Sequence, residues 1–268
     1  MEKKFPLRFF IVTFLWTWLI LITCSLLIRT KLIPESLSLP FIIFSAFGPA
    51  AGTFFSLRTI EGKGSIKKYL QKFKSFKFGW IVWISIFLVL GLASFIAWIV
   101  PELFGLNRLS QYMPIYFFLP YLVICILFGG GQEEIGWRGY ILPYLEKKYG
   151  LIIGSLILGI IWAIWHLPLW FIPGSTQSYM NFFSFILLTI GYSYFFSWII
   201  EKSGNRLLSG PIVHGTGNGI IVLFPTLIME KNTIQIRFWI YCIIIFIAGI
   251  IIVTTRTIKT KQSRKNGP

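Results

Sequence analysis

The sequence predicts an all-α, polytopic membrane protein with about eight transmembrane helices. Two observations lead to this fold class. Hydrophobic residues make up 56% of the 268 residues, whereas charged residues make up 13%. Apolar runs of about 20 residues recur along the chain, and each is long enough to cross a bilayer. A transmembrane β-barrel would instead show short segments of alternating polarity, which the sequence lacks. We therefore expect one transmembrane domain and no soluble domain.

The predicted spans are residues 9–28, 38–57, 79–100, 118–142, 151–171, 182–200, 207–229 and 237–255. The first follows Lys3, Lys4 and Arg8 as a signal peptide would, but its length and the lack of a small-residue cleavage site favour a retained anchor. Glycines and polar residues interrupt the fourth and seventh spans. We expect the fourth helix to continue to about Leu142, with Pro143 as the break.

Basic residues predict the orientation in the membrane. If the N-terminus is cytoplasmic, 20 of the 25 Lys and Arg residues lie on the cytoplasmic side, and leaving out Arg138, which lies within a span, hardly changes the ratio. Since cytoplasmic loops carry an excess of these residues, both termini are predicted to be cytoplasmic. The short loops and the Ile- and Lys-rich composition are typical of a bacterial chain, so we expect a multi-pass protein of a bacterial cell membrane.

Two segments hold much of the formal net charge of +16. Residues 58–78 interleave lysines with Ile, Tyr, Leu and Phe, which predicts a basic amphipathic helix on the anionic cytoplasmic leaflet. Residues 256–268 form a basic tail that we expect to be disordered. Because this charge lies beside membrane spans, the predicted partner is the lipid bilayer and not nucleic acid.

The cysteines predict no disulfide framework. Cys24, Cys125 and Cys242 are scattered singly in apolar runs, without a C-x-x-C pair. We interpret them as small buried hydrophobic residues, a common role for free cysteine.

Apart from Arg237 at the edge of the last span, five residues with acidic, basic or imidazole side chains lie inside the predicted spans, where a charge is costly. They are Glu133, Glu134, Arg138, His166 and His214, and they include both histidines of the chain. Glu134 and Arg138 are four residues apart on one helical face, so they can form a neutralising, positioning pair. Glu133 is rotated by about 100° from Glu134 on a helix and is left free of that pair. We therefore interpret Glu133 as the working carboxylate.

The histidines lie in two further motifs. His214 and Asn218, in the stretch GPIVHGTGNGI, are again four residues apart and project in the same direction. His166, in WAIWHLPLW, lies one turn after Trp162. The other two tryptophans of that stretch, Trp165 and Trp170, are interpreted as lipid-facing or interfacial. The polar cluster requires a cavity that water can reach, since dry burial would neutralise the carboxylate.

One carboxylate, two imidazoles and one carboxamide favour amide hydrolysis by activated water. Glu133 can accept a proton from water as a general base, and His166 can orient that water or share its proton. His214 and Asn218 can donate hydrogen bonds to the oxyanion that forms. The sequence has no G-x-S-x-G or other recognisable nucleophile motif, so we expect no covalent intermediate.

A zinc-dependent mechanism is the alternative, because two histidines and a glutamate form a common catalytic zinc set. However, the H-E-x-x-H motif of soluble zinc proteases is absent. Arg138 lies close by, and Asn218 is a poor zinc ligand but a good hydrogen-bond donor. The residues favour a mechanism that needs no cofactor, with zinc kept as the alternative.

Together, the three motifs resemble those of the CPBP family of intramembrane proteases, which is also called the Abi or CAAX-protease family. The matching stretches are EEIGWR at 133–138, WAIWH at 162–166 and HGTGN at 214–218. The family includes type II CAAX prenyl endopeptidases and bacteriocin-processing or self-immunity proteins. The chain departs from the family pattern at Trp162, where Phe is usual.

The resemblance implies an intramembrane endopeptidase of the glutamate type or the metalloprotease type, between which the family's assignment is disputed. It implies the same roles as the residues themselves: Glu133 and His166 activate water, His214 and Asn218 form the oxyanion site, and Glu134 and Arg138 hold the site together. The expected substrate is a membrane-associated protein or peptide, such as a leader peptide, a bacteriocin precursor or a segment of a membrane protein.

Two other functions stay open. A proton-coupled permease would relay protons through Glu133 and the histidines, but it predicts an internal repeat that the sequence does not display. A catalytically idle immunity or scaffold protein would bind a partner peptide within the membrane. That reading predicts eroded motifs, whereas every matched catalytic position is retained here.

Overall fold

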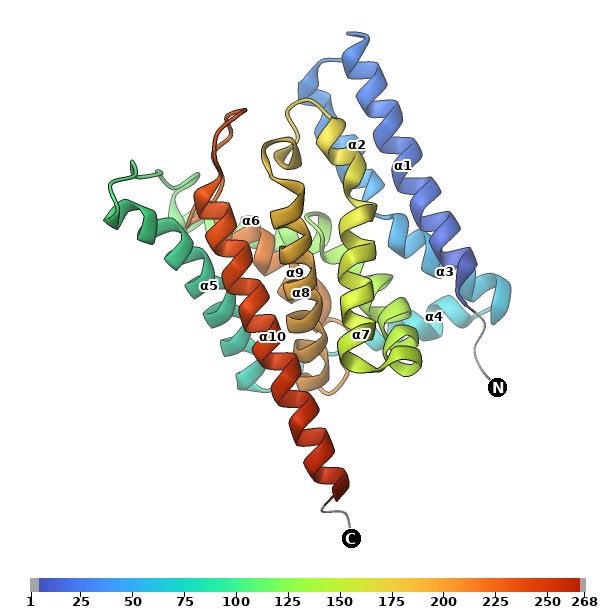
Figure 1. Ribbon diagram of the computed structural model, residues 1–268. Coiled ribbons are helices and arrows are strands. Elements are labelled where there is room, and N and C mark those ends of the chain that lie inside the picture. The colour runs from blue at the N-terminus through green and yellow to red at the C-terminus, as the bar shows by residue number, and fades with distance from the viewer. Residues whose placement is uncertain (1–4, 266–268) are drawn as a thin grey trace.

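The computed structural model describes residues 5–265, with side chains through Arg256, and these residues contain helices and no β-strand. Helices α1, α7, α8 and α10 stand roughly upright in one bundle, with α5 tilted beside them (Figure 1). In chain order the α-helices are α1 (Leu7–Arg29), α2 (Ser38–Ser45), α3 (Gly48–Ile60), α4 (Ser65–Leu70), α5 (Trp80–Leu103), α6 (Phe118–Phe128), α7 (Leu142–Trp165), α8 (Phe182–Lys202), α9 (Ser209–Gly219) and α10 (Ile236–Lys265). The predicted all-α class is confirmed.

Helix α8 forms the centre of the bundle. It packs against α7 and α10, and it also contacts α5 and α9. Of its 21 residues, 14 are buried, as expected for a helix that is covered on all sides. At Gly191 the backbone of α10 comes so close that a Cβ atom would lie 2.7 Å from the carbonyl oxygen of Ile245.

Six helical stretches within residues 5–265 are long and apolar enough to cross a membrane, two fewer than predicted. They are Leu7–Arg29, Glu35–Ile60, Trp80–Leu103, Gly131–Phe171, Phe182–Lys202 and Ile236–Arg256. These stretches confirm a polytopic helical membrane protein. The start of α1 and the end of α10 lie at the same end of the bundle (Figure 1), as an even number of crossings requires. Which end is cytoplasmic stays a prediction.

The fourth predicted span, residues 118–142, is not one helix. Helix α6 ends at Phe128, and the chain continues as a 3₁₀-helix (Gly131–Ile135) and a π-helical turn (Trp137–Ile141). Gly130 between them has a φ of +113°, a left-handed conformation that glycine adopts readily and that ends a right-handed helix. The glycine run therefore stops the helix just before the two glutamates.

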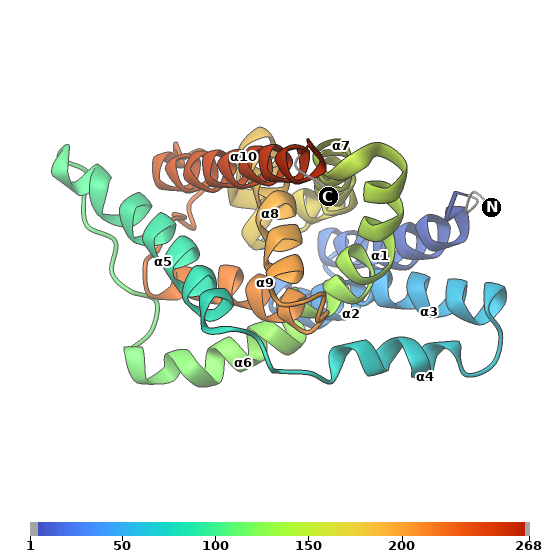
Figure 2. The same ribbon diagram turned by 90° about the horizontal axis from the view of Figure 1, so that it is seen from below.

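Helix α6 also lies across the bundle and not along it (Figure 2). Figure 2 shows it on the same edge of the molecule as α4, and it packs against α9. With 11 residues it is too short to cross a bilayer. Its apolar composition predicted a span. However, hydropathy indicates only that a helix lies in apolar surroundings, and it does not indicate the orientation of the helix axis.

The next helix begins where the prediction placed a break. Pro143 lies in the first turn of α7, where its missing N–H costs nothing. The break lies at Gly150, which has a φ of +80° and divides α7 into two helical parts. The predicted start of the fifth span at residue 151 coincides with the second part.

Two further segments differ from the prediction. The seventh span, residues 207–229, has its α-helix only as far as Gly219, because three closely spaced glycines weaken it and Pro225 follows. The basic tail continues α10 as a helix to Lys265, since a helix propagates easily once it has formed. Residues 266–268 of the tail lie outside the described residues.

The three cysteines are free and buried, as predicted.

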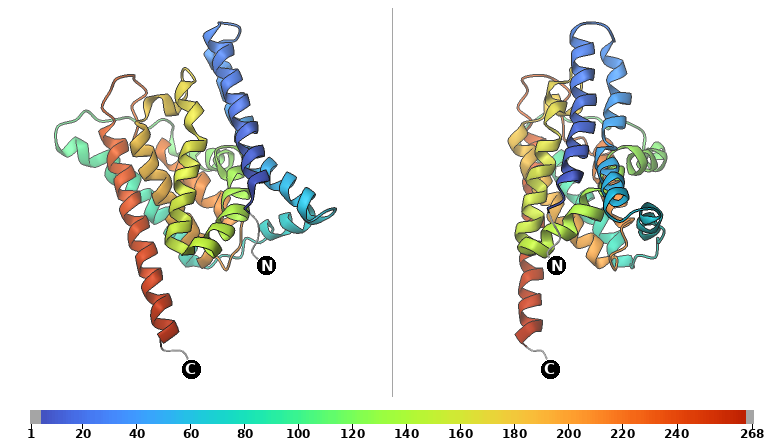
Figure 3. Two further views of the ribbon diagram at one scale, coloured as in Figure 1. Left: turned by 45° about the vertical axis from the view of Figure 1, so that its right-hand side comes forward. Right: turned by 90° about the vertical axis from the view of Figure 1, so that its right-hand side faces the viewer.

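Helices α1 and α3 pack through small residues, and α1 also packs against α2, as the right view of Figure 3 shows. A Cβ atom on Gly48 would lie 2.8 Å from the carbonyl oxygen of Thr13, and one on Gly52 would lie 2.7 Å from that of Phe9. Small residues of this kind let two helix backbones approach closely in a membrane.

We expect Gly52→Ala to lower the free energy of unfolding by about 1–3 kcal/mol, because the added methyl group overpacks the α1–α3 contact. Thermal unfolding in detergent measures this change. Gly91→Ala in α5 is the matched control, since nothing lies within 4 Å of a Cβ atom there. Equal unfolding temperatures for the two variants would contradict the close packing.

Candidate active site

The six polar residues singled out in the sequence come together in the structure from three separate segments. The 3₁₀- and π-helical segment after α6 carries Glu133, Glu134 and Arg138. His166 caps the C-terminal end of α7, and His214 and Asn218 lie on α9. Contacts between these segments, described next, define the site.

Glu134 and Arg138 form the predicted ion pair. Arg138 Nη1 lies 2.8 Å from Glu134 Oε1, and neither side chain is exposed to solvent. His214 Nδ1 lies 2.8 Å from the same oxygen. Because an ionised carboxylate only accepts hydrogen bonds, Nδ1 carries the proton and donates it. Glu134 therefore joins the first motif to the third.

The arginine is held between two aromatic rings. Arg138 Cζ lies 4.2 Å from the ring centroid of Trp162 and 5.0 Å from that of Phe196. Its Nη2 donates to Ser193 Oγ at 3.4 Å. Cation–π contacts of a desolvated guanidinium are worth about 2 kcal/mol. Helices α7 and α8 thus fix the ion pair in the middle of the bundle.

Glu133 faces the second motif. Trp162 Nε1 donates a hydrogen bond to Glu133 Oε2 at 2.8 Å. The same oxygen lies 3.9 Å from His166 Nε2. That distance is too long for a direct hydrogen bond, but a water molecule beside both atoms can bond to each.

The tautomer of His166 follows from its partner. His166 Nδ1 lies 2.8 Å from the carbonyl oxygen of Trp162. A carbonyl oxygen can only accept, so Nδ1 carries the proton. In the neutral ring, Nε2 then presents a lone pair toward Glu133 and can accept a hydrogen bond from water.

His214 and Asn218 converge beside Gly130. A Cβ atom on Gly130 would touch His214 Nε2 and would lie 2.8 Å from Asn218 Nδ2. Asn218 Nδ2 donates to the carbonyl oxygen of Gly129 at 2.8 Å and keeps its second N–H. His214 Nδ1 already donates to Glu134, so Nε2 can donate only when the ring is an imidazolium. Glycine at position 130 leaves the space in front of both nitrogens open.

Burial divides the residues into two groups. The side chains of Glu133 and His166 keep 6% and 10% of their surface exposed. Those of Glu134 and Arg138 keep none. Glu133 and His166 thus keep a small exposed surface, while Glu134 and Arg138 are enclosed. This division parallels the predicted working and positioning carboxylates.

Sequence reasoning missed two features of the site and misplaced one residue. The indole N–H of Trp162 and the open space at Gly130 were not expected. The use of Trp where Phe is usual was the available signal for the first. Trp165 does not face lipid as predicted: it is 2% exposed and packs against His166 and Trp137, with ring centroids 4.6 and 5.6 Å apart.

The same residues bear on metal ligation. Among the side chains described, no group of three or more His, Cys, Asp or Glu residues lies in an arrangement that could hold a metal ion. The Nδ1 atoms of His166 and His214 are both occupied by oxygen acceptors. The zinc alternative is addressed by an experiment below.

A comparison with protein families bears on the segment that carries the motifs. Residues 114–220 match the family model described as "Type II CAAX prenyl endopeptidase Rce1-like". The match runs from just before α6 to just after α9, and all six site residues lie within it. This segment of the chain is therefore similar to the type II CAAX endopeptidases of the CPBP family.

A curated relative supports the same resemblance. The "CAAX prenyl protease 2" of Methanococcus maripaludis is 28% identical over 116 residues, which cover 41% of this chain and 40% of the relative. The aligned part is thus less than half of either protein. The two matches confirm the resemblance that the three motifs predicted.

We expect Arg138→Met to lower the free energy of unfolding by about 3–5 kcal/mol, because it leaves the buried Glu134 carboxylate without its arginine. Denaturation with increasing amounts of SDS in mixed micelles measures the loss. The double variant Glu134→Leu/Arg138→Met removes both charges and should recover part of it.

Arg108→Met is the control for that variant. Arg108 pairs with Glu102 at 3.3 Å, but its own side chain is 68% exposed. Its loss should cost less than about 1 kcal/mol. An Arg138 variant as stable as this control would show that the buried pair contributes nothing to folding.

Proposed function

We propose that this protein is an intramembrane endopeptidase that hydrolyses a peptide bond of a membrane-associated protein or peptide. The observation that carries the proposal is the separation of 3.9 Å between two hydrogen-bond acceptors, Glu133 Oε2 and His166 Nε2, on side chains that keep a small exposed surface. A glutamate and a neutral imidazole at this distance can hold one water molecule between them.

In the proposed mechanism that water donates one hydrogen to Glu133 Oε2 and the other to His166 Nε2. Its lone pair is then free to attack the carbonyl carbon of the substrate. As the new C–O bond forms, the proton moves to Glu133 and the carbonyl electrons move to oxygen. When the C–N bond breaks, protonated Glu133 returns the proton to the leaving amine. Glu133 therefore acts first as a general base and then as a general acid.

The negative oxygen of the intermediate needs hydrogen-bond donors. The second N–H of Asn218 and, in its imidazolium form, Nε2 of His214 supply them in the space beside Gly130. Glu134 and Arg138 act as positioning residues: Glu134 orients His214, and Arg138 holds Glu134 in place. Trp162 adds a positioning contact to Glu133 that the family's usual Phe cannot make.

The proposed substrate is a leader peptide, a bacteriocin precursor or a segment of a membrane protein. The printed name of the Methanococcus relative, a CAAX prenyl protease, supports a peptide that is held at the membrane. Exposed apolar side chains along the outer helices support contact with the lipid bilayer. A multi-pass location in the cell membrane of a bacterium completes the proposal.

We expect Glu133→Gln to lower kcat for peptide cleavage by about 10²–10⁴-fold, the usual contribution of a general base. The measurement uses purified protein in detergent and a library of membrane-protein peptides, with and without a strong chelator. The unfolding temperature of the variant is the control for folding.

The chelator arm separates the two catalytic classes. Cleavage that survives the chelator supports the metal-free mechanism, whereas cleavage that is lost and returns with added zinc would overturn it. If wild type cleaves no peptide and also fails in intact membranes, the permease and scaffold alternatives become the better explanations.

We expect Trp162→Phe to lower kcat by about tenfold, which corresponds to about 1.4 kcal/mol, because Phe keeps the ring but lacks the N–H that binds Glu133. Trp165→Phe is the matched control. Its indole also packs against His166, but its Nε1 has no hydrogen-bond partner among the described residues. Equal activities of the two variants would contradict a role for the Trp162 N–H.

A further inference from the structure

A second polar site lies on the segment that links α3 to α5. A pocket of about 580 Å³ opens there, and its lining includes four cationic side chains and no acidic one. The cations are Arg58, Lys63, Lys67 and Lys74. None of the six candidate active-site residues lines this pocket, so it is a separate site.

The four cations are available to a ligand. All four are exposed, and none forms a salt bridge with any residue in the described part of the chain. Four like charges around one hollow repel each other and create a strongly positive potential. An anion in the pocket would relieve that repulsion. The chemistry of the lining therefore selects a negatively charged ligand.

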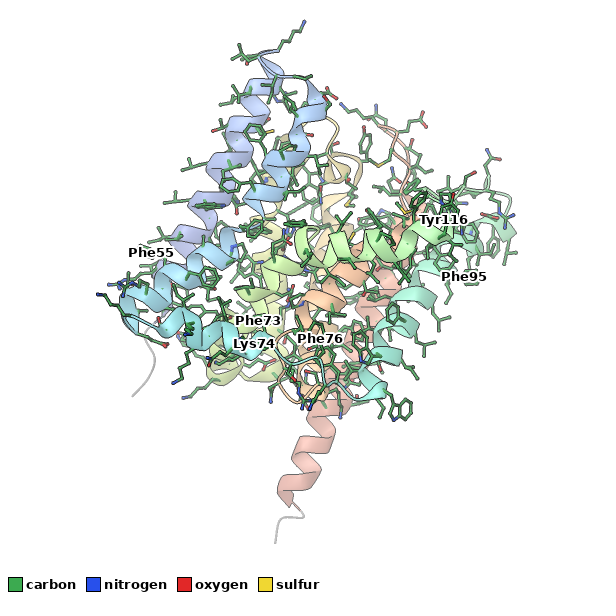
Figure 4. All side chains as sticks on the ribbon, turned by 180° about the vertical axis from the view of Figure 1, so that it is seen from behind. Phe55, Phe73, Lys74, Phe76, Phe95 and Tyr116 are labelled. Atoms are coloured by element: carbon green, nitrogen blue, oxygen red, sulfur yellow. The ribbon has the colours of Figure 1, made fainter. Side chains whose placement is uncertain are left out.

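Apolar side chains beside the pocket indicate where that ligand comes from. Ile60 is 62% exposed and Phe76 is 67% exposed, and Leu70 of the lining is also exposed. Figure 4 shows Phe73, Lys74 and Phe76 close together below α6. Cations beside exposed large apolar side chains are typical of protein surfaces that lie in the interface of an anionic bilayer.

We propose that this pocket binds the headgroup of an anionic membrane phospholipid and that the bound lipid holds the glutamate-bearing segment in its active arrangement. The four cations contact the phosphate and its net negative charge, and the exposed apolar side chains contact the acyl chains. A zwitterionic lipid such as phosphatidylcholine carries a quaternary ammonium group that the same cations repel.

The link to the active site is Tyr69, a buried residue of α4 that does not line the pocket. The Tyr69 hydroxyl donates a hydrogen bond to the carbonyl oxygen of Ile135, which directly follows the two glutamates. Gly139 leaves room for this hydroxyl, since a Cβ atom there would collide with it. Burial raises the pKa of the Tyr69 phenol above its ordinary value, so the hydroxyl stays protonated and remains a donor. A lipid that fixes α4 therefore also fixes the backbone at Ile135.

The lipid site is tested by binding. The full chain is titrated in detergent with phosphatidylglycerol, and retained lipid is counted by native mass spectrometry. Lys67→Gln/Lys74→Gln should weaken binding at least tenfold. Lys68→Gln/Lys77→Gln removes the same charge from exposed positions that do not line the pocket, and it should change binding less than twofold.

Three outcomes would overturn the lipid site. Equal losses of lipid binding in the two double variants would indicate that the lipid is attracted by the surface charge as a whole and not by the pocket. Wild-type binding by Lys67→Gln/Lys74→Gln would exclude the pocket. Displacement of the lipid by millimolar inorganic phosphate would indicate a site for a soluble anion and not for a membrane lipid.

The coupling rests on the proposed function, so it is tested with two readouts. In nanodiscs, phosphatidylglycerol should slow amide hydrogen exchange in residues 131–139 and raise peptide cleavage about threefold or more over phosphatidylcholine alone. Tyr69→Phe should keep the lipid affinity and lose both responses. Unchanged responses in Tyr69→Phe would refute the coupling. If no peptide is cleaved in any membrane, the protease proposal fails, while the exchange measurement still decides the coupling.

Discussion

A single carboxylate oxygen, Oε1 of Glu134, accepts hydrogen bonds from both Arg138 and His214 inside an apolar bundle. A charge at this depth is stable only when its partners are also buried and well oriented. The arrangement of α7, α8 and α9 follows from this requirement, because each contributes a ring or a donor that encloses the pair. Trp162, whose ring contacts Arg138, also forms hydrogen bonds with Glu133 and His166, and so attaches these two catalytic candidates to the enclosed pair.

The site needs irregular backbone, which a membrane ordinarily forbids. Peptide groups in hydrocarbon must be hydrogen-bonded within the protein. Here Gln132 Nε2 donates to the carbonyl oxygen of Phe128, and Asn218 Nδ2 donates to that of Gly129. These two side chains provide hydrogen bonds to carbonyl groups at the end of α6 that would otherwise lack a partner, and they allow the chain to turn toward Glu133. The irregular segment is covered by α3 and α9 and does not face lipid.

Much of this could be predicted from the sequence, and the failures have physical causes. The pairing of Glu134 with Arg138 followed from a spacing of four residues. The two side chains meet as they would on an α-helix, even though the segment is partly 3₁₀- and partly π-helical. The direction of α6 could not be predicted, because an apolar helix has the same composition across a bundle as along it. The Trp162 contact with Glu133 joins residues 29 positions apart, and no local pattern reports such a distance. The prediction that Trp165 faces lipid was wrong for the same reason.

Asn218 has two tasks, since it presents an N–H beside Gly130 and also satisfies the Gly129 carbonyl at the end of α6. The hydrogen bond of the Glu133 carboxylate is to the Trp162 side chain and not to a backbone group. If the proposed activity were lost in a descendant of this chain, Glu133 would be free to change, whereas Asn218 and Arg138 would still be retained for folding. An inactive protein derived from this scaffold would therefore keep most of the motif residues. The residue at position 133 should then distinguish active from inactive relatives better than the number of motifs retained.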